Sequence, residues 1–286
     1  MSNLKIFVDL TRLNRPIGYL LLFWPCGWGL AYAYSFEKNI ENYLLYNLLF
    51  FCGAVLMRSA GCIVNDIVDR KLDRRVQRTK NRPLASKLIS VKKSLIYVLS
   101  LCGLAFFILI QFNLLTIVLG LASMTLAFSY PFMKRITYWP QLFLGLTFNW
   151  GFIMAWSSIT NYLSIEIFLI YASAIFWTLG YDTIYGAQDI VDDEIIGVKS
   201  TSIKFKKMLK KFVFICYSIS LIILALFFFN KMNSFYFLIP FSAFALSLYY
   251  QIFSFNKKKP LTCLNAFKIN NFSGFYLLLT FLTFSI

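Results

Sequence analysis

The chain has 286 residues, of which 59% are hydrophobic and only 14% are charged, and its mean hydropathy is +0.68. This composition excludes a water-soluble domain of this length and indicates an integral membrane protein. The formal net charge of +16 is better explained by membrane topology and anionic lipid than by nucleic acid, because no nucleic-acid-binding pattern accompanies it.

Nine apolar stretches follow one another along the chain, each near the ~20 residues that a helix needs to cross a bilayer. They cover residues 17–35, 43–64, 94–111, 113–130, 140–159, 163–181, 212–229, 234–253 and 270–286. The first could be taken for a secretory signal peptide, because arginines precede it and Ala31-Tyr32-Ala33 ends it. It contains Trp24-Pro25 and further spans follow, so we expect it to stay as the first helix. The sequence predicts an all-α polytopic membrane protein of about nine helices, with residues 1–286 as one domain.

Lysine and arginine are concentrated in alternate connections between these stretches. The N-terminus and every second connection hold 25 of the 28, the intervening connections hold Lys38 and Lys231, and Arg58 lies inside the second stretch. By the positive-inside rule, the N-terminus is predicted to lie in the cytoplasm and the C-terminus outside.

The residue types that are missing limit the possible chemistry. The six cysteines form no C-x-x-C pair and most lie within apolar stretches, so they are interpreted as packing residues. The chain has no histidine, which excludes an imidazole base, a Ser-His nucleophile and most zinc sites. Any chemistry must therefore use carboxylates, phenols, cations and a hard metal ion.

Eight of the twelve acidic residues lie in two short runs, each next to a long apolar stretch on the predicted cytoplasmic side. The first run contains Asp66, Asp69 and Asp73, and the second contains Asp182, Asp189, Asp192, Asp193 and Glu194. A helix that continues out of the second stretch would align Asn65, Asp69 and Asp73 on one face. Asp182, Tyr185, Asp189 and Asp192 or Asp193 have a similar spacing at the end of the sixth stretch.

Carboxylates stacked in this way repel one another, so a cation is needed to keep them ionised together. Magnesium fits best, because it is a hard ion that takes carboxylate oxygens and shares its other positions with substrate phosphates. Two facing sets suggest two ions. The alternative, ordinary polar helix ends paired with neighbouring lysines and arginines, explains neither the duplicated spacing nor the scarcity of carboxylates elsewhere.

Arginine recurs every four residues from the first run onward, at Arg70, Arg74, Arg78 and Arg82. Guanidinium groups clamp phosphate oxygens in pairs, although the positive-inside charge of this connection accounts for part of the pattern. A connection that mixes carboxylates with cations favours a metal diphosphate as its ligand.

Two segments resemble the signatures of the UbiA family of membrane prenyltransferases. The first runs from Met57 to Asp73 and continues with Arg78-Thr79 and Asn81-Arg82-Pro83-Leu84; the second is Tyr181-Asp182-Thr183-Ile184-Tyr185 with Asp189, Asp192, Asp193 and residues 196–201. The likeness includes Arg12 to Gly18 and Tyr130 to Arg135, and so covers most of the chain up to about residue 205, with Gly186-Ala187-Gln188 as a departure. The Arg-Pro-Ile-Gly and Arg-Ser-Ala-Gly-Cys stretches favour the branch that acts on 4-hydroxybenzoate in the ubiquinone pathway.

This resemblance implies a magnesium-dependent transfer of a polyprenyl group from polyprenyl diphosphate to the ring carbon ortho to the hydroxyl of 4-hydroxybenzoate. It implies a multi-pass protein of the bacterial inner membrane, or of the mitochondrial inner membrane if the source is eukaryotic, with the active site facing the cytoplasm and the prenyl tail in membrane lipid. The residues implied to hold magnesium, directly or through water, are Asp66, Asp69, Asp73, Asp182, Asp189 and Asp193. Those implied to contact the diphosphate are Asn65, Arg78, Arg82 and Lys134.

The acceptor carboxylate needs a cation, and Arg58 is the only charge in the second stretch, on the same helical face as Asn65. Arg70 and Arg135 compete for this role. Among the aromatic residues, Tyr185 is the favoured stabiliser of a carbocation, because it lies one turn from Asp182.

Other functions stay open from the sequence. The acceptor could be homogentisate, a naphthoate, haem or another porphyrin, or a lipid headgroup. From a different class, an ion-coupled transporter would also carry intramembrane acidic residues, but here the carboxylates lie at one face rather than mid-membrane. A structural scaffold would need no paired acidic motifs.

Overall fold

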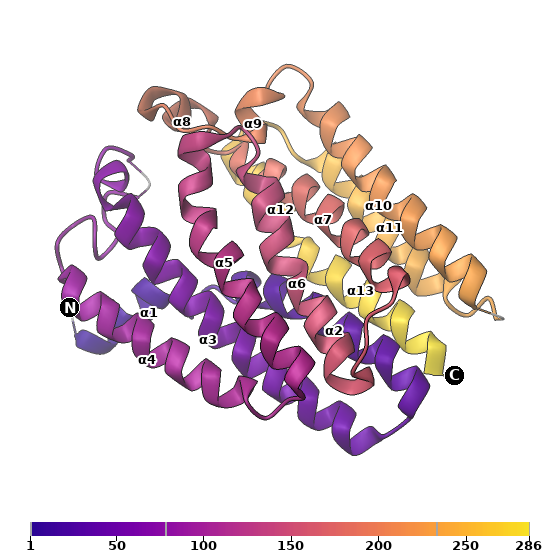
Figure 1. Ribbon diagram of the computed structural model, residues 1–286. Helices are drawn as coiled ribbons and strands as arrows, with labels where there is room; N and C mark the ends of the chain where they lie inside the picture. The colour runs from indigo at the N-terminus through magenta and orange to yellow at the C-terminus, as the bar shows by residue number, and fades with distance from the viewer. Residues whose placement is uncertain (1, 78, 233, 286) are drawn as a thin grey trace.

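The computed structural model describes residues 2–77, 79–232 and 234–285, and within them the chain is helical with no strand (Figure 1). The long helices are α2 (Ile17–Glu37), α3 (Ile40–Asp73), α4 (Val91–Leu109), α5 (Leu114–Ile136), α6 (Pro140–Thr160), α7 (Ile165–Gly186), α10 (Leu209–Lys231), α11 (Leu238–Ser254) and α13 (Asn270–Leu282). The short ones are α1 (Asn3–Thr11), α8 (Ile190–Ile196), α9 (Thr201–Lys204), α12 (Pro260–Lys268) and the 3-10 helix η1 (Thr283–Ser285). In the described part of the chain, a helix lies over each predicted apolar stretch.

Six of these helices are long and apolar enough to cross a membrane, namely α3, α4, α5, α6, α7 and α10, and α11 is a shorter apolar helix. Polar side chains cap the N-termini of several helices. Asn39 caps α3, Ser90 caps α4 and Asn113 caps α5, and each side chain accepts a hydrogen bond from a backbone N–H of the first turn. These caps pair with backbone N–H groups that have no acceptor within the helix, because no helical turn precedes them. The chain is therefore an all-α membrane protein, as its composition predicted.

The centre of the bundle is formed by α2, α6 and α7. Gly29 of α2 lies so close to α6 that a Cβ there would be 2.6 Å from the carbonyl oxygen of Phe152. Between α6 and α7, the fully buried Asn149 donates to Thr178 Oγ1 at 2.8 Å and to the carbonyl of Ala174 at 3.1 Å. The close approach of α2 to α6 and the buried hydrogen bonds between α6 and α7 hold these three helices together.

A buried polar network joins the C-terminal helices to α7. Tyr217 donates to Gln251 Oε1 at 2.7 Å, Gln251 donates to Asn270 Oδ1 at 3.2 Å, and the indole N–H of Trp177 donates to the same Asn270 oxygen at 2.9 Å. Polar groups in such a site are costly unless paired, so the network favours one arrangement of α7, α10, α11 and α13.

The polar segments gather at one end of the bundle, where residues 74–77 and 79–90 follow α3 and where α8 and α9 follow α7 (Figure 1). Residues 74–77 and 79–90 are held to the end of α3 and to one another by hydrogen bonds. Thr79 Oγ1 donates to the carbonyl of Asp73 at 3.0 Å, and Arg74 Nε donates to the carbonyl of Ala85 at 2.7 Å. These described residues therefore pack as part of this end of the molecule.

The second acidic run differs from the sequence prediction, because it does not lie on one continuous helix. Helix α7 ends at Gly186, the chain turns, and Asp189 is the N-cap of α8. The turn forms because α9 packs on the end of α7: Ser202 Oγ donates to the carbonyl of Thr183 at 2.8 Å, and a Cβ on Gly186 would lie 2.7 Å from that hydroxyl. Helical spacing therefore does not place Asp189 on the face of Asp182.

Candidate active site

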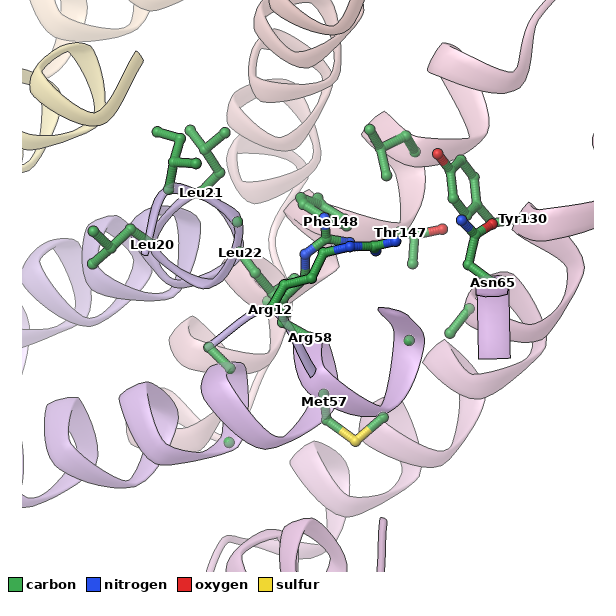
Figure 2. A pocket seen from close by; sticks show the side chains of 18 of the residues that line it. Arg12, Leu20, Leu21, Leu22, Met57, Arg58, Asn65, Tyr130, Thr147 and Phe148 are labelled. Atoms are coloured by element: carbon green, nitrogen blue, oxygen red, sulfur yellow. The ribbon is translucent and has the colours of Figure 1, made fainter. Parts of the chain in front are cut away.

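A cavity of about 1620 Å³ lies between α2, α3, α4, α5 and α6 and reaches the polar end of the bundle. Its charged and polar lining includes Arg12, Arg58, Asn65, Arg82, Tyr130, Asp182 and Tyr185. The rest is largely apolar and follows α4 as far as Phe112, beyond the end of that helix. Figure 2 shows Arg12, Arg58, Asn65 and Tyr130 in this wall. A cavity with one charged part and a long apolar part suits an amphiphilic ligand.

Arg58 projects into the cavity from the middle of α3 (Figure 2). Its guanidinium carbon lies 5.3 Å from the ring centroid of Phe148, and a Cβ on Gly18 would lie 2.9 Å from its Nε. Among the described residues Arg58 makes no ion pair, although its charge acts on Asp182. An aromatic face and a glycine thus hold a guanidinium that can receive an anionic group of a ligand.

Two carboxylates of the first run are paired with arginines of the cavity wall. Asp66 is 1% exposed, and its Oδ1 lies 2.6 Å from Arg12 Nη2 and 3.2 Å from Arg82 Nη1. Arg82 also lies 3.0 Å from Asp73 Oδ2. Burial by itself lowers the pKa of the Arg12 guanidinium, but the negative charge of Asp66, together with smaller effects of Cys62 and Tyr185, outweighs burial and raises the pKa above its usual value. The Arg12 guanidinium is therefore held charged in the cavity wall.

The third carboxylate, Asp69, is paired with cations from α5. Lys134 Nζ donates to its Oδ2, and Arg135 Nη2 lies 3.5 Å from its Oδ1 and 2.8 Å from the carbonyl oxygen of Val68. The first run therefore lies on one helix as predicted, but its carboxylates are divided between two groups of cations. None of the three is among the residues that line the cavity.

In the second run, Asp182 and Tyr185 line the cavity, whereas Asp189 and Asp193 lie at the start of α8 outside that lining. Within residues 2–77, 79–232 and 234–285, no three Asp, Glu, Cys or His side chains are grouped closely enough to hold a metal ion. The donor chemistry nevertheless fits magnesium, since carboxylates and the Asn65 amide are hard oxygen donors beside one charged cavity.

The repeat of arginines does not form one face, because α3 ends at Asp73. Arg70 Nη1 donates to the carbonyl of Ile67 at 2.7 Å, Arg74 Nε donates to the carbonyl of Ala85, and Arg82 lines the cavity. Arg78 lies outside the described residues. Of the described members of this repeat, Arg82 alone lines the cavity.

Arg12 is a residue of the cavity wall that the sequence reasoning did not assign. It is the C-cap of α1 in a left-handed conformation, with φ of 56°, and this turn directs the chain into α2. The available signal was its position at the start of the Arg12 to Gly18 stretch. Gln188 and Lys268 also line the cavity and were not predicted.

Comparison with known proteins decides the family. Residues 22–274 match the UbiA prenyltransferase family. The chain belongs to this family. The resemblance found in its two acidic segments is thereby confirmed.

Relatives in this family carry specific names. The chain is 41% identical to 4-hydroxybenzoate octaprenyltransferase of Vibrio vulnificus (strain CMCP6) over 277 residues, which cover 96% of this chain and 95% of that protein. It is 46% identical to the protein of the same name from Vibrio atlanticus (strain LGP32) over 73% of this chain and 72% of that one. A mitochondrial 4-hydroxybenzoate polyprenyltransferase of Caenorhabditis elegans is 45% identical, and the match spans 59% of its length and 74% of this chain.

Solved structures of UbiA homologues have the same fold. The apo structure from Aeropyrum pernix K1 superimposes with a TM-score of 0.78 and 19% identity, covering 93% of this chain and 98% of that one. The homologue from Archaeoglobus fulgidus bound to GPP and Mg2+ has a TM-score of 0.68 and 16% identity, covering 96% and 99%. The all-helical UbiA fold is therefore established for this chain.

Proposed function

We propose that this protein transfers a polyprenyl group from a polyprenyl diphosphate to the ring carbon ortho to the hydroxyl of 4-hydroxybenzoate, as a step of ubiquinone biosynthesis. The observation that carries this proposal is the 41% identity to the Vibrio vulnificus octaprenyltransferase along 96% of the chain. The cavity supports it, because its apolar part suits a prenyl chain and its charged part suits a diphosphate and a carboxylate.

The diphosphate would lie at the charged end of the cavity. Asn65 and Arg82 would donate to its oxygens, with Lys134 and Arg78 as further cations. When bound, Mg2+ would be held directly or through water by Asp66, Asp69, Asp73, Asp182, Asp189 and Asp193, and would neutralise charge on the departing diphosphate. Arg82 and Lys134, which pair with Asp73 and Asp69, could then turn to the phosphate oxygens.

The acceptor would be held by its carboxylate on Arg58. The competing cations support this choice, since Arg70 and Arg135 bond to the backbone carbonyls of Ile67 and Val68. The allylic carbon–oxygen bond would break as diphosphate leaves, the ring carbon would bond to the resulting allylic carbocation, and the ring would then lose the proton from that carbon. Tyr185, in the cavity wall, would present its electron-rich ring to the carbocation.

The prenyl tail would follow the apolar part of the cavity along α4 and α5. Phe106, Leu121 and Phe128 line this part, and all three are also exposed on the molecule's surface. In a bilayer such a lining lets a long tail pass into lipid, which explains why the reaction would need a membrane-embedded protein.

The membrane topology is part of the proposal. Nine helices would span the inner membrane of a bacterium, or of a mitochondrion if the source is eukaryotic, with the N-terminus and the charged end of the cavity in the cytoplasm or its equivalent. The distribution of lysine and arginine supports this orientation. Residues 1–286 would form one domain.

The test is to incubate membranes that contain the protein with labelled 4-hydroxybenzoate and a short prenyl diphosphate, with and without magnesium, beside an Asp69→Asn variant. We expect magnesium-dependent labelled lipid from the wild type and a large loss in the variant. Product only with homogentisate, a naphthoate or a porphyrin would overturn the acceptor. An absence of product with every acceptor, together with ion-coupled uptake, would favour a transporter.

A further inference from the structure

A second cavity, of about 800 Å³, lies between the start of α10 and the segment that joins α11 to α12. Six lysines line it: Lys206, Lys207, Lys210, Lys211, Lys257 and Lys259. We call it the lysine pocket. Two segments far apart in the sequence, residues 206–211 and 257–259, converge to form it, and no acidic residue is among its described lining residues.

The positive charge of the lysine pocket is mostly uncompensated by protein. Lys206 pairs with Glu194 of α8 at 2.8 Å, while the other five lysines make no ion pair within the part of the chain that the structure describes. Lys257 Nζ donates to the carbonyl of Lys206 at 2.8 Å, which ties the two segments together. The positive-inside rule accounts for lysines in both connections, but not for their convergence on one hollow. Six lysines around one hollow, with one acidic partner among the described residues, create a positive potential that favours an anion.

An apolar surface adjoins the pocket. Met208 and Phe253, which line it, are 56% and 79% exposed. Along α10 and α11 the exposed surface continues with Phe214 and Tyr250, and α10 is one of the helices that can cross a membrane. A free phosphate ion would contact only the lysines, whereas an anionic lipid would contact the lysines with its headgroup and the apolar surface with its acyl chains.

We propose that the lysine pocket binds the phosphate headgroup of an anionic phospholipid, with the acyl chains along the seam between α10 and α11. Lysine suits this role, because its compact ammonium group binds phosphate as a point charge and its long stem packs on apolar surface. Basic hollows between membrane helices on the cytoplasmic side are a known form of headgroup site. This site is separate from the large cavity and does not depend on the reaction proposed there.

The test uses the full-length protein in detergent micelles and native mass spectrometry, with phosphatidylglycerol and phosphatidylcholine of the same acyl chains as probes. The triple variant Lys207→Gln, Lys211→Gln and Lys259→Gln removes three lysines whose side chains make no hydrogen bond or ion pair among the described residues. A matched control, Lys5→Gln, Lys87→Gln and Lys92→Gln, removes the same charge from exposed lysines elsewhere on the predicted cytoplasmic side. A Lys→Arg version of the first triple variant keeps the charge.

We expect the wild type, the control and the arginine variant to bind phosphatidylglycerol at least about tenfold more tightly than phosphatidylcholine, and the glutamine variant to lose most of this preference. Thermal unfolding of all four proteins without added lipid reports whether each is folded. An equal loss of preference in the control would overturn the proposal, because it would show a general effect of net charge. Displacement of phosphatidylglycerol by an equal concentration of inorganic phosphate would overturn it as well, since the pocket would then bind free phosphate.

Discussion

Arg12 Nη2 lies 2.6 Å from Asp66 Oδ1, although 54 residues separate the two in the sequence. Asp66 is fully enclosed on α3, and Arg12 ends α1, so this ion pair attaches the first helix to the bundle. It also holds the Arg12 guanidinium in the wall of the large cavity. The pair therefore links the stability of the N-terminal segment to the shape of the candidate site.

Replacement of Arg12 by alanine should lower the free energy of unfolding by about 3 kcal/mol, because the buried carboxylate of Asp66 loses its nearest partner. Unfolding of the purified protein in micelles measures this. Lys5→Ala, on the exposed side of α1, is the control and should change little. In a double-mutant cycle, Asp66→Asn should cost less in the Arg12→Ala background than alone. Independent effects in that cycle would contradict the pairing.

Arg58→Ala should raise the apparent KM for 4-hydroxybenzoate by tenfold or more, with a much smaller change for the prenyl diphosphate. The physical reason is that a guanidinium bound to a carboxylate contributes about 1.5–3 kcal/mol. Steady-state kinetics with each substrate varied in turn measures the difference. Lys71→Ala, an exposed residue on the same helix, serves as the control. Equal losses for both substrates would rule out this role for Arg58.

Gly18→Ala should weaken acceptor binding without a large loss of stability. The new Cβ would lie 2.9 Å from Arg58 Nε, so the guanidinium must move, and it can do so because it ends a flexible side chain. Gly61→Ala adds the same methyl group to the cavity wall where nothing lies within 4 Å, and should leave the KM for the acceptor nearly unchanged. If the two variants have the same KM for the acceptor, the position of the Arg58 guanidinium does not limit acceptor binding.

Gly180→Ala should destabilise the bundle by roughly 1–3 kcal/mol, because the added Cβ would overlap the ring of Tyr217 on α10. Tyr217 cannot move away easily, since its hydroxyl donates to Gln251. Gly103→Ala, on α4 with nothing within 4 Å, is the matched control and should be neutral or slightly stabilising. Thermal unfolding in micelles distinguishes them, and a Tm for Gly180→Ala at or above that of the control would contradict this packing argument.

The sequence by itself determined the helices and the residues that mark the family. Apolar length and the need to satisfy every backbone polar group in lipid predict helices locally, so the nine stretches and the helical alignment of Asn65, Asp69 and Asp73 required no tertiary information. Arg58 could be singled out because a charge in an apolar helix is costly and therefore conspicuous.

The tertiary structure decided the partners of the charged residues. Asp66 and Asp69 are three residues apart on one helix, yet one is paired with Arg12 and the other with Lys134, because different helices approach their two sides. The break after Gly186 likewise depends on the packing of α9, which helical spacing does not encode. Such contacts join residues remote in the chain, and their geometry is set by how the whole bundle packs rather than by local pattern.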